Sequence, residues 1–239
     1  MPPHIAYLGG IAFIAGLIQG FTGFGVVLVA LPLMVLLIDI KTAIPLVLLL
    51  GMVINLMLTG QLVRHFETQK WLPLLVAALP GIPLGIWTLK TVGARPLEIM
   101  VGVVILLTVA GCLGFKQAGQ EHHRFWAWAA GLASGFLGGS IGAAGPPVVI
   151  YTALQPWTKE QVKGTMVAFF ALSGLGIIGL HLYSGLITAT VWRYWAYCLL
   201  PLVLGVGLGM RLYSRSNEMV YRRAVLILLA MLGLTMLFK

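Results

Sequence analysis

The sequence contains few charged residues, and very few of them are acidic. Only 9% of its 239 residues are charged, and six in total are Asp or Glu, whereas about a quarter of the residues in a soluble domain are charged. Another 60% are hydrophobic, which is more apolar surface than a water-soluble core can bury. The composition therefore predicts an all-α polytopic membrane protein and excludes an ordinary soluble domain.

The groups that carry out catalysis or ion coupling are also scarce. Every acidic residue lies in or beside a predicted loop, so none is placed at mid-membrane depth as a proton or sodium relay. The two cysteines, Cys112 and Cys198, lie in apolar segments without metal-ligand spacing. No phosphate-binding loop, zinc-ligand pair or nucleophile–base motif is visible. We therefore predict no enzymatic activity, no cofactor and no metal site.

The net charge of +9 has a membrane explanation. The basic residues gather in short loops between apolar segments, which is typical of the cytoplasmic loops of membrane proteins. They do not form a basic face interleaved with aromatic side chains, as a nucleic-acid-binding protein would require. We expect the lipid bilayer as a partner and no nucleic acid.

Two of the apolar segments are too long for one span. A helix needs about 20 residues to cross the hydrocarbon core, yet the first segment covers 5–38 and the fifth 124–155. Both contain glycine clusters, "GFTGFG" at 20–25 and "GFLGGSIG" at 135–142. The remaining segments have ordinary lengths: 42–63, 71–89, 97–115, 162–183, 190–210 and 219–238.

The two long segments match each other in sequence. A shift of 115 residues superposes 12–34 on 127–149 with eight identities in 23 positions. Further on, Asn55 aligns with Ser173 and Pro80 with Pro201 after small changes of shift. The chain therefore reads as two homologous transmembrane repeats, 1–118 and 119–239, with a joint near 116–124.

The repeats can be parallel or inverted across the membrane. If each long segment is a single span, the copies are parallel; if each enters and leaves on the same side, the copies are inverted. The inverted arrangement places ten of the 15 basic residues on one side, against nine for the parallel one. Together with the segment lengths, this count favours inverted repeats with both termini outside the cytoplasm.

A helix broken inside the membrane must be buried in protein or line a cavity. Inverted-repeat transporters bind substrate at such breaks, where helix N-termini offer N–H groups and a positive partial charge. The predicted substrate-binding residues are glycines and neutral donors around the two breaks, together with Phe24 and two polar residues on the following helices: Gln19, Thr22, Gly23, Phe24, Gly25, Asn55, Ser134, Gly138, Gly139, Ser140, Gly142 and Ser173.

Other roles compete at several of these positions. Gly16, Gly20, Gly131 and Gly135 have the four-residue spacing of small-residue helix-packing faces, and we predict packing for them. Asn55 and Ser173 fit polar contacts between helices as well as they fit a substrate site. His181 is the one titratable candidate within a span, and its place near the end of that span predicts a residue at the membrane interface.

The paired motifs "GFTGFGVVLVALPL" (20–33) and "GFLGGSIGAAGPPVVIY" (135–151) resemble those of the TauE/SafE family of membrane permeases, also called the sulfite exporter family. The resemblance covers essentially the whole chain. It implies a multi-pass transporter of small sulfur-containing anions in a bacterial or archaeal cytoplasmic membrane. The first motif departs from members with a richer glycine run, because Phe24, Val26 and Val27 occupy such places.

The leading hypothesis is a secondary transporter or facilitator that exports a small anion, sulfite or an organosulfonate such as sulfoacetate. Neutral donors would bind the anion without trapping it, and no coupling carboxylate is required. Import of a sulfur-containing or carboxylate anion is the alternative within transport, and a non-transporting membrane scaffold is the alternative outside it. A homodimer is left open.

Overall fold

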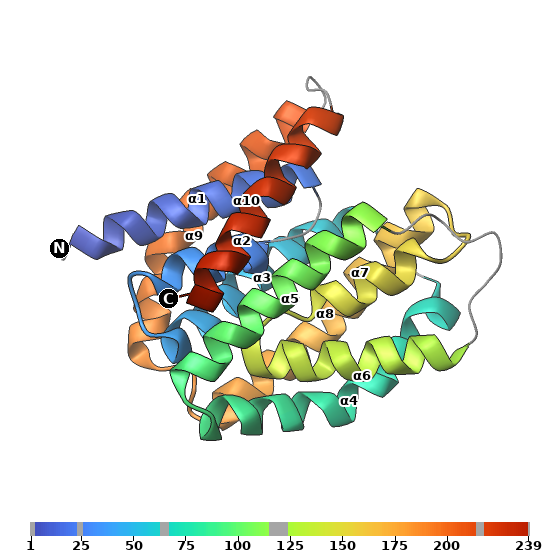
Figure 1. Ribbon diagram of the computed structural model, residues 1–239, viewed down its shortest axis with the longest axis horizontal. Coiled ribbons are helices and arrows are strands. Elements are labelled where there is room, and N and C mark those ends of the chain that lie inside the picture. The colour runs from blue at the N-terminus through green and yellow to red at the C-terminus, as the bar shows by residue number, and fades with distance from the viewer. Residues whose placement is uncertain (1–2, 23–25, 63–66, 115–123, 214–217, 239) are drawn as a thin grey trace. The chain divides into compact units, whose positions relative to one another are not determined.

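The computed structural model describes residues 3–22, 26–62, 67–114, 124–213 and 218–238, and all regular structure within these residues is helical (Figure 1). These described residues form α1 (Pro3–Thr22), α2 (Val26–Val35), α3 (Ile40–Leu62), α4 (Thr68–Thr91), α5 (Ala94–Gly114), α6 (Arg124–Ile141), α7 (Gly145–Ala153), α8 (Lys159–Tyr183), α9 (Ala189–Tyr213) and α10 (Glu218–Phe238).

The helices confirm the all-α membrane fold predicted from the sequence. Each ordinary apolar segment is one helix, whereas the long segment 5–38 contains α1 and α2, and the long segment 124–155 contains α6 and α7. Within the described residues, five helices are long and apolar enough to cross a membrane, namely α3, α4, α5, α8 and α9. Large apolar side chains such as Trp87 and Leu200 are exposed, as expected for a surface that contacts lipid.

The chain divides into two compact units that each draw on both predicted repeats. Unit 1 comprises Met1–Gly51, Ala94–Val109 and Ser184–Lys239, and unit 2 comprises Met52–Gly93 and Ala110–Tyr183. The division between the units therefore cuts α3 between Gly51 and Met52 and α5 between Val109 and Ala110. The predicted joint near 116–124 lies almost entirely outside the described residues.

One close helix pair dominates each unit. In unit 1, α1 packs along α9, and in unit 2, α4 packs along α6, which Figure 1 shows side by side. Thus the first helix of each predicted repeat pairs with a helix from the other repeat. Each helix also runs in the same direction as its partner, because Gly9 of α1 meets Pro201 of α9 and Gly20 meets Val206.

Glycines allow the backbones in these pairs to come close together. A side chain added at Gly16 or Gly20 of α1 would overlap the main chain of α9, and one at Gly205 of α9 would overlap the carbonyl of Phe13. In the other pair, Gly131 and Gly135 of α6 lie against the carbonyls of Leu74 and Ala78. The predicted packing role of the four spaced glycines is therefore confirmed.

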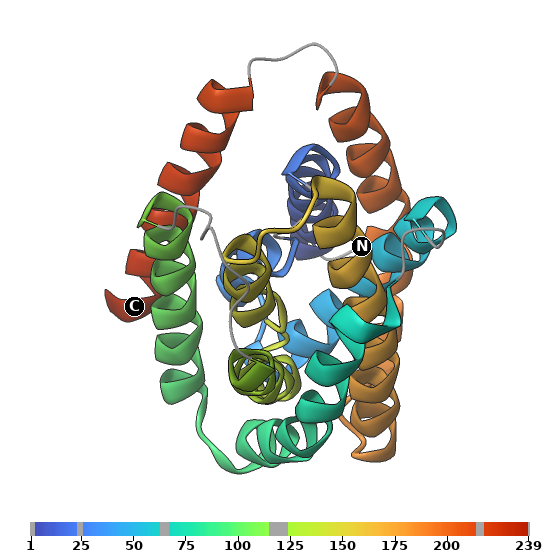
Figure 2. The ribbon, with the colours of Figure 1, turned by 90° about the vertical axis from the view of Figure 1, so that its right-hand side faces the viewer.

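One further contact in each unit shows how two of its helices run relative to each other. In unit 2, α4 and α8 begin together: the Gln161 amide donates to the Glu67 carboxylate at 2.9 Å. In unit 1, α5 and α10 run in opposite directions, because the Arg95 guanidinium at the start of α5 donates to the carbonyls of Met236 and Leu237 at the end of α10. Figure 2 shows α10 beside α5.

Candidate functional site

The second glycine cluster contains a helix break. Helix α6 ends at Ile141, and Gly142 then adopts a φ of 72°, a left-handed conformation that glycine reaches without strain. Its N–H donates to the Gly138 carbonyl at 3.2 Å, and the Ala143 N–H donates to the Leu137 carbonyl at 3.2 Å. These bonds satisfy two carbonyls near the end of α6, and the chain turns into α7 at Gly145.

Two consecutive prolines begin α7. Pro146 and Pro147 occupy its first turn, where the missing proline N–H costs no helical hydrogen bond. The same prolines remove two of the amides that a helix N-terminus normally offers to an anion. Gly145 and Val148 are left as the main-chain donors in the first turn of α7. The half-helix therefore offers fewer amides to an anion than the motif alone suggests.

The first cluster separates α1 from α2, but its centre is not described. Gly23, Phe24 and Gly25 lie outside the described residues, and so does the side chain of Thr22. The flanking residues show how the two helices are tied together. The Gln19 Oε1 atom, on α1, accepts a hydrogen bond of 2.8 Å from the N–H of Val26, the first residue of α2. A buried side chain of α1 thus caps the N-terminus of α2.

Ser134 occupies the repeat-equivalent position of Gln19 and performs a related task. Its hydroxyl donates to the carbonyl of Ala144, the residue directly before α7. Positions 19 and 134 therefore each bind the first half-helix to the start of the second. Both side chains are among the predicted substrate-binding residues, and that role stays a prediction. Their shared repeat position and polar character were the signal that could have indicated a common structural role.

Two other predicted hydroxyls bond within their own helices. Ser140 donates to the Phe136 carbonyl at 2.7 Å, and Ser173 donates to the Phe169 carbonyl at 2.6 Å. Both side chains are buried, and each oxygen keeps acceptor capacity. Asn55 is half-buried on α3 and has interactions of its own.

Gly138 and Gly139 lie inside the last turn of α6, so their amides belong to the helical ladder. Gly139 packs against the Ile82 carbonyl of α4. At Gly138, an added Cβ would stand 2.7 Å from Ile177 Cδ1 of α8. These glycines therefore let α4 and α8 approach the end of α6.

His181, predicted to lie at the membrane interface, is near the C-terminal end of α8, and its depth in the membrane stays a prediction. It is completely buried on α8, with Nδ1 2.9 Å from the Ile177 carbonyl. One turn of helix therefore separates it from the residue that packs on Gly138. The apolar context of α8 gave no sign of which face carried the imidazole.

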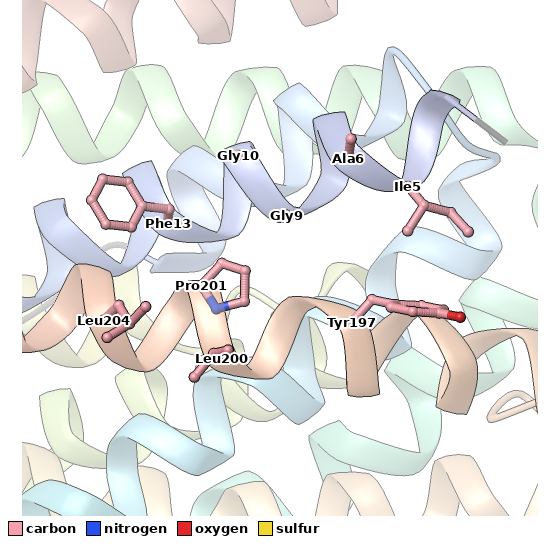
Figure 3. Close-up of a pocket in the computed structure, with 9 residues that line it drawn as sticks. All are labelled: Ile5, Ala6, Gly9, Gly10, Phe13, Tyr197, Leu200, Pro201 and Leu204. Atoms are coloured by element: carbon pink, nitrogen blue, oxygen red, sulfur yellow. The ribbon is translucent and has the colours of Figure 1, made fainter. Parts of the chain in front are cut away.

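A groove of about 480 Å³ lies between α1 and α9, but its chemistry does not suit an anion (Figure 3). The hydroxyl of Tyr197 is the one polar side-chain group in its lining, and the other residues are apolar or glycine. Among the described residues, no group of three or more His, Cys, Asp or Glu side chains could hold a metal. The helix breaks therefore remain the candidate site.

Comparisons with known proteins agree with this architecture. Residues 8–236 match the family described as "Sulfite exporter TauE/SafE". Searches of curated proteins and of solved structures gave no match. The matched range contains both glycine clusters, most of α1, all of α2, α6 and α7, and all the candidate spans. Because the match extends over nearly the whole chain, the protein belongs to the TauE/SafE sulfite exporter family.

Proposed function

We propose that the protein is a secondary transporter or facilitator that exports sulfite or a related organosulfonate, such as sulfoacetate, across the cytoplasmic membrane. Membership of the family implies a multi-pass transporter of sulfur anions. The observation that carries the proposal is the interruption of the helix at Gly142, in a family-matched segment otherwise long enough for a continuous helix. Such an interruption in a membrane is tolerated where it lines a cavity or is buried in protein.

We further propose that the two repeats are inverted. In parallel repeats, α4 and α8 would begin on opposite sides of the membrane, and α5 and α10 would run in the same direction. The Glu67–Gln161 hydrogen bond joins the starts of α4 and α8, and Arg95 joins the start of α5 to the end of α10. Each contact lies within one compact unit, and both support inversion.

The anion would be bound by neutral groups at the breaks. In the described residues, the Asn55 and Gln19 amides and the main-chain N–H groups of Gly145 and Val148 would supply this chemistry. The hydroxyls of Ser140 and Ser173 would join them by turning from the Phe136 and Phe169 carbonyls toward the anion. Thr22 and the segment 23–25 complete the proposed set. Donors without full charge attract an anion while allowing it to leave. A negative-inside potential adds about 2.3 kcal/mol per charge per 100 mV in favour of export.

Flux of labelled sulfite and sulfoacetate from proteoliposomes tests the proposal. Wild-type protein should release at least one anion down its gradient. Ser140→Ala together with Ser173→Ala should slow release about 30-fold, since two lost hydrogen bonds of about 1 kcal/mol each sum to about 2 kcal/mol. Gly176→Ala on α8 is the matched control, because a Cβ there has nothing within 4 Å. Well-folded protein with no flux above empty liposomes contradicts transport and favours a scaffold; flux in the inward direction alone favours import.

A further inference from the structure

The imidazole of His181 is buried with one nitrogen occupied and the other not. Nδ1 lies 2.9 Å from the Ile177 carbonyl. Because a carbonyl only accepts hydrogen bonds, Nδ1 must carry the proton, and the neutral ring then presents a lone pair on Nε2. Nε2 is buried and has no hydrogen-bond partner among the described residues. Nε2 of His181 is therefore a buried acceptor nitrogen whose orientation is set by the backbone. Its lone pair can accept a proton or a hydrogen bond.

The position of this nitrogen relates it to the helix break. Ile177, whose carbonyl orients the ring, is the residue that packs into the space left by Gly138. Gly138 in turn accepts the hydrogen bond from Gly142 that closes α6. A short chain of contacts thus links the imidazole to the proposed anion site within unit 2.

Within the described residues of unit 2, no carboxylate is placed to neutralise a charged imidazole at position 181. In the described residues of unit 2, α8 packs mainly against α4, α6 and α7, and Gly174 also meets Met52 of α3. The described part of α3 in this unit has no ionisable side chain. The ionisable residues on the other three helices are Lys70 and Lys90 on α4, Arg124 on α6 and Tyr151 on α7. On α8 itself they are Lys159, Glu160, Lys163 and Tyr183.

Most of these groups lie at the far end of α8. Lys70 and Tyr151 both contact Trp157, just before α8 begins, about 30 Å from His181 along the helix. Arg124 is the first residue of α6. The starts of α6 and α4 lie at the same end of the pair, because Gly131 of α6 packs against Leu74 of α4. At the end that carries His181, Lys90 and Tyr183 are exposed. Among the described residues of unit 2, none is therefore placed as a counter-ion for a proton on Nε2.

We propose that His181 binds the transported anion together with one proton, and this rests on the proposed function. The proton enters from water onto Nε2, or arrives on the anion as the hydroxyl of hydrogen sulfite, and Nε2 and the oxyanion share it. A buried imidazolium is costly alone, as is a buried anion, but pairing the two cancels one unit of the anion's charge. Anion binding and protonation of His181 are therefore coupled.

Affinity measured against pH tests the coupling. Sulfoacetate is the main probe because its charge stays constant between pH 6 and pH 8. We expect detergent-purified wild-type protein to bind sulfoacetate at least about ten-fold more tightly at pH 6 than at pH 8. This ratio corresponds to a shift of about one unit in the pKa of His181 when the anion binds. His181→Gln should abolish this dependence, and His123→Gln, the matched control, should retain it. The same dependence in His181→Gln, or none in wild type, overturns the proposal.

If His181→Gln does not fold, nuclear magnetic resonance of the wild-type protein with labelled histidine tests the same coupling. The signal of His181 is then assigned by its loss in His181→Asn. Sulfoacetate should shift the His181 titration toward higher pH; an unchanged titration while the anion binds contradicts the inference. If no sulfur anion binds or moves, the proposed function fails. The same titrations with acetate and chloride then decide whether His181 pairs with any anion, and no shift with either overturns the inference separately.

Discussion

At the scale of single residues, neighbouring glycines on the same helix have different roles. Gly205 of α9 faces the Phe13 carbonyl so closely that any side chain would overlap it, whereas a Cβ at Gly207 has nothing within 4 Å. The first is a packing requirement and the second is not. Sequence alone does not separate them, because both lie in the same apolar stretch, "LGVGLG", and only the partner helix distinguishes their faces.

Gly205→Ala should therefore destabilise the α1–α9 pair by about 1–3 kcal/mol, the usual cost of overpacking. Gly207→Ala should be neutral or slightly stabilising, because alanine favours a helix over glycine by about 0.5–1 kcal/mol. Thermal unfolding of the two variants in one detergent, followed by size-exclusion chromatography, compares them. Equal melting temperatures for both variants would contradict the close approach.

Glu67 provides a pH-dependent contact outside the spans. The hydrogen bond from Lys70, then that from Gln161, lowers the pKa of Glu67 below its ordinary value of 4.5. Because the folded state prefers the ionised carboxylate, this stabilisation is complete above pH 4.5 and is lost as the pH falls through the lowered folded pKa. The group is exposed, so the effect is small.

Wild-type protein should melt slightly above Glu67→Gln at pH 7, and the difference should close as the pH falls below 4.5. Melting curves at several pH values measure the difference. Lys70→Met removes the first partner and should reproduce the neutral-pH loss. A difference that grows on acidification would mean that the carboxylate is not held by these contacts.

At the scale of helices, the excess length of two segments was the strongest signal in the sequence. It predicted that each would be more than one helix, and the structure resolves each into two. The length limit is set by bilayer thickness, so this prediction needed no tertiary information. The contacts of Gln19 and Ser134 with the second half-helices could not be foreseen in the same way, because they depend on how each pair folds back.

Gly142 is the residue on which the second break depends most directly. Gly142→Ala should destabilise the protein by about 1–2 kcal/mol, because a φ of 72° is unfavourable for a residue with a side chain. Anion flux should fall with it if the break forms the site. Gly145→Ala is the control, since its Cβ would stand 3.9 Å from the nearest atom, Phe170 Cζ. Normal melting and flux in Gly142→Ala would show that the left-handed turn is dispensable.

At the scale of the whole molecule, the repeat and the charge count indicated inverted copies without proving them. Basic residues gave ten against nine of 15, which is too small a margin to decide. The stronger support comes from which helix ends meet, and this is tertiary information. The sequence also did not predict that the first helix of each repeat packs against a helix of the other repeat. Hydropathy identifies membrane spans but does not show which spans are in contact.

Labelling of single cysteines checks the inverted arrangement. In a background with Cys112 and Cys198 replaced by serine, Gln69→Cys and Glu160→Cys should react with an impermeant maleimide from the same side of the membrane. Thr91→Cys, at the other end of α4, should react from the opposite side. Labelling of positions 69 and 160 from opposite sides would restore the parallel arrangement.

The pairing of α1 with α9 has a consequence for synthesis of the chain. The ribosome releases α1 first, yet its partner begins at Ala189, whereas α4 and α6 are separated by a much shorter stretch of chain. The α4–α6 pair can pack while translation continues, whereas the glycine face of α1 stays uncovered until α9 has been synthesised. We therefore expect the molecule to assemble from the middle of the chain outward, with α1 packing against its partner only after α9 has been synthesised.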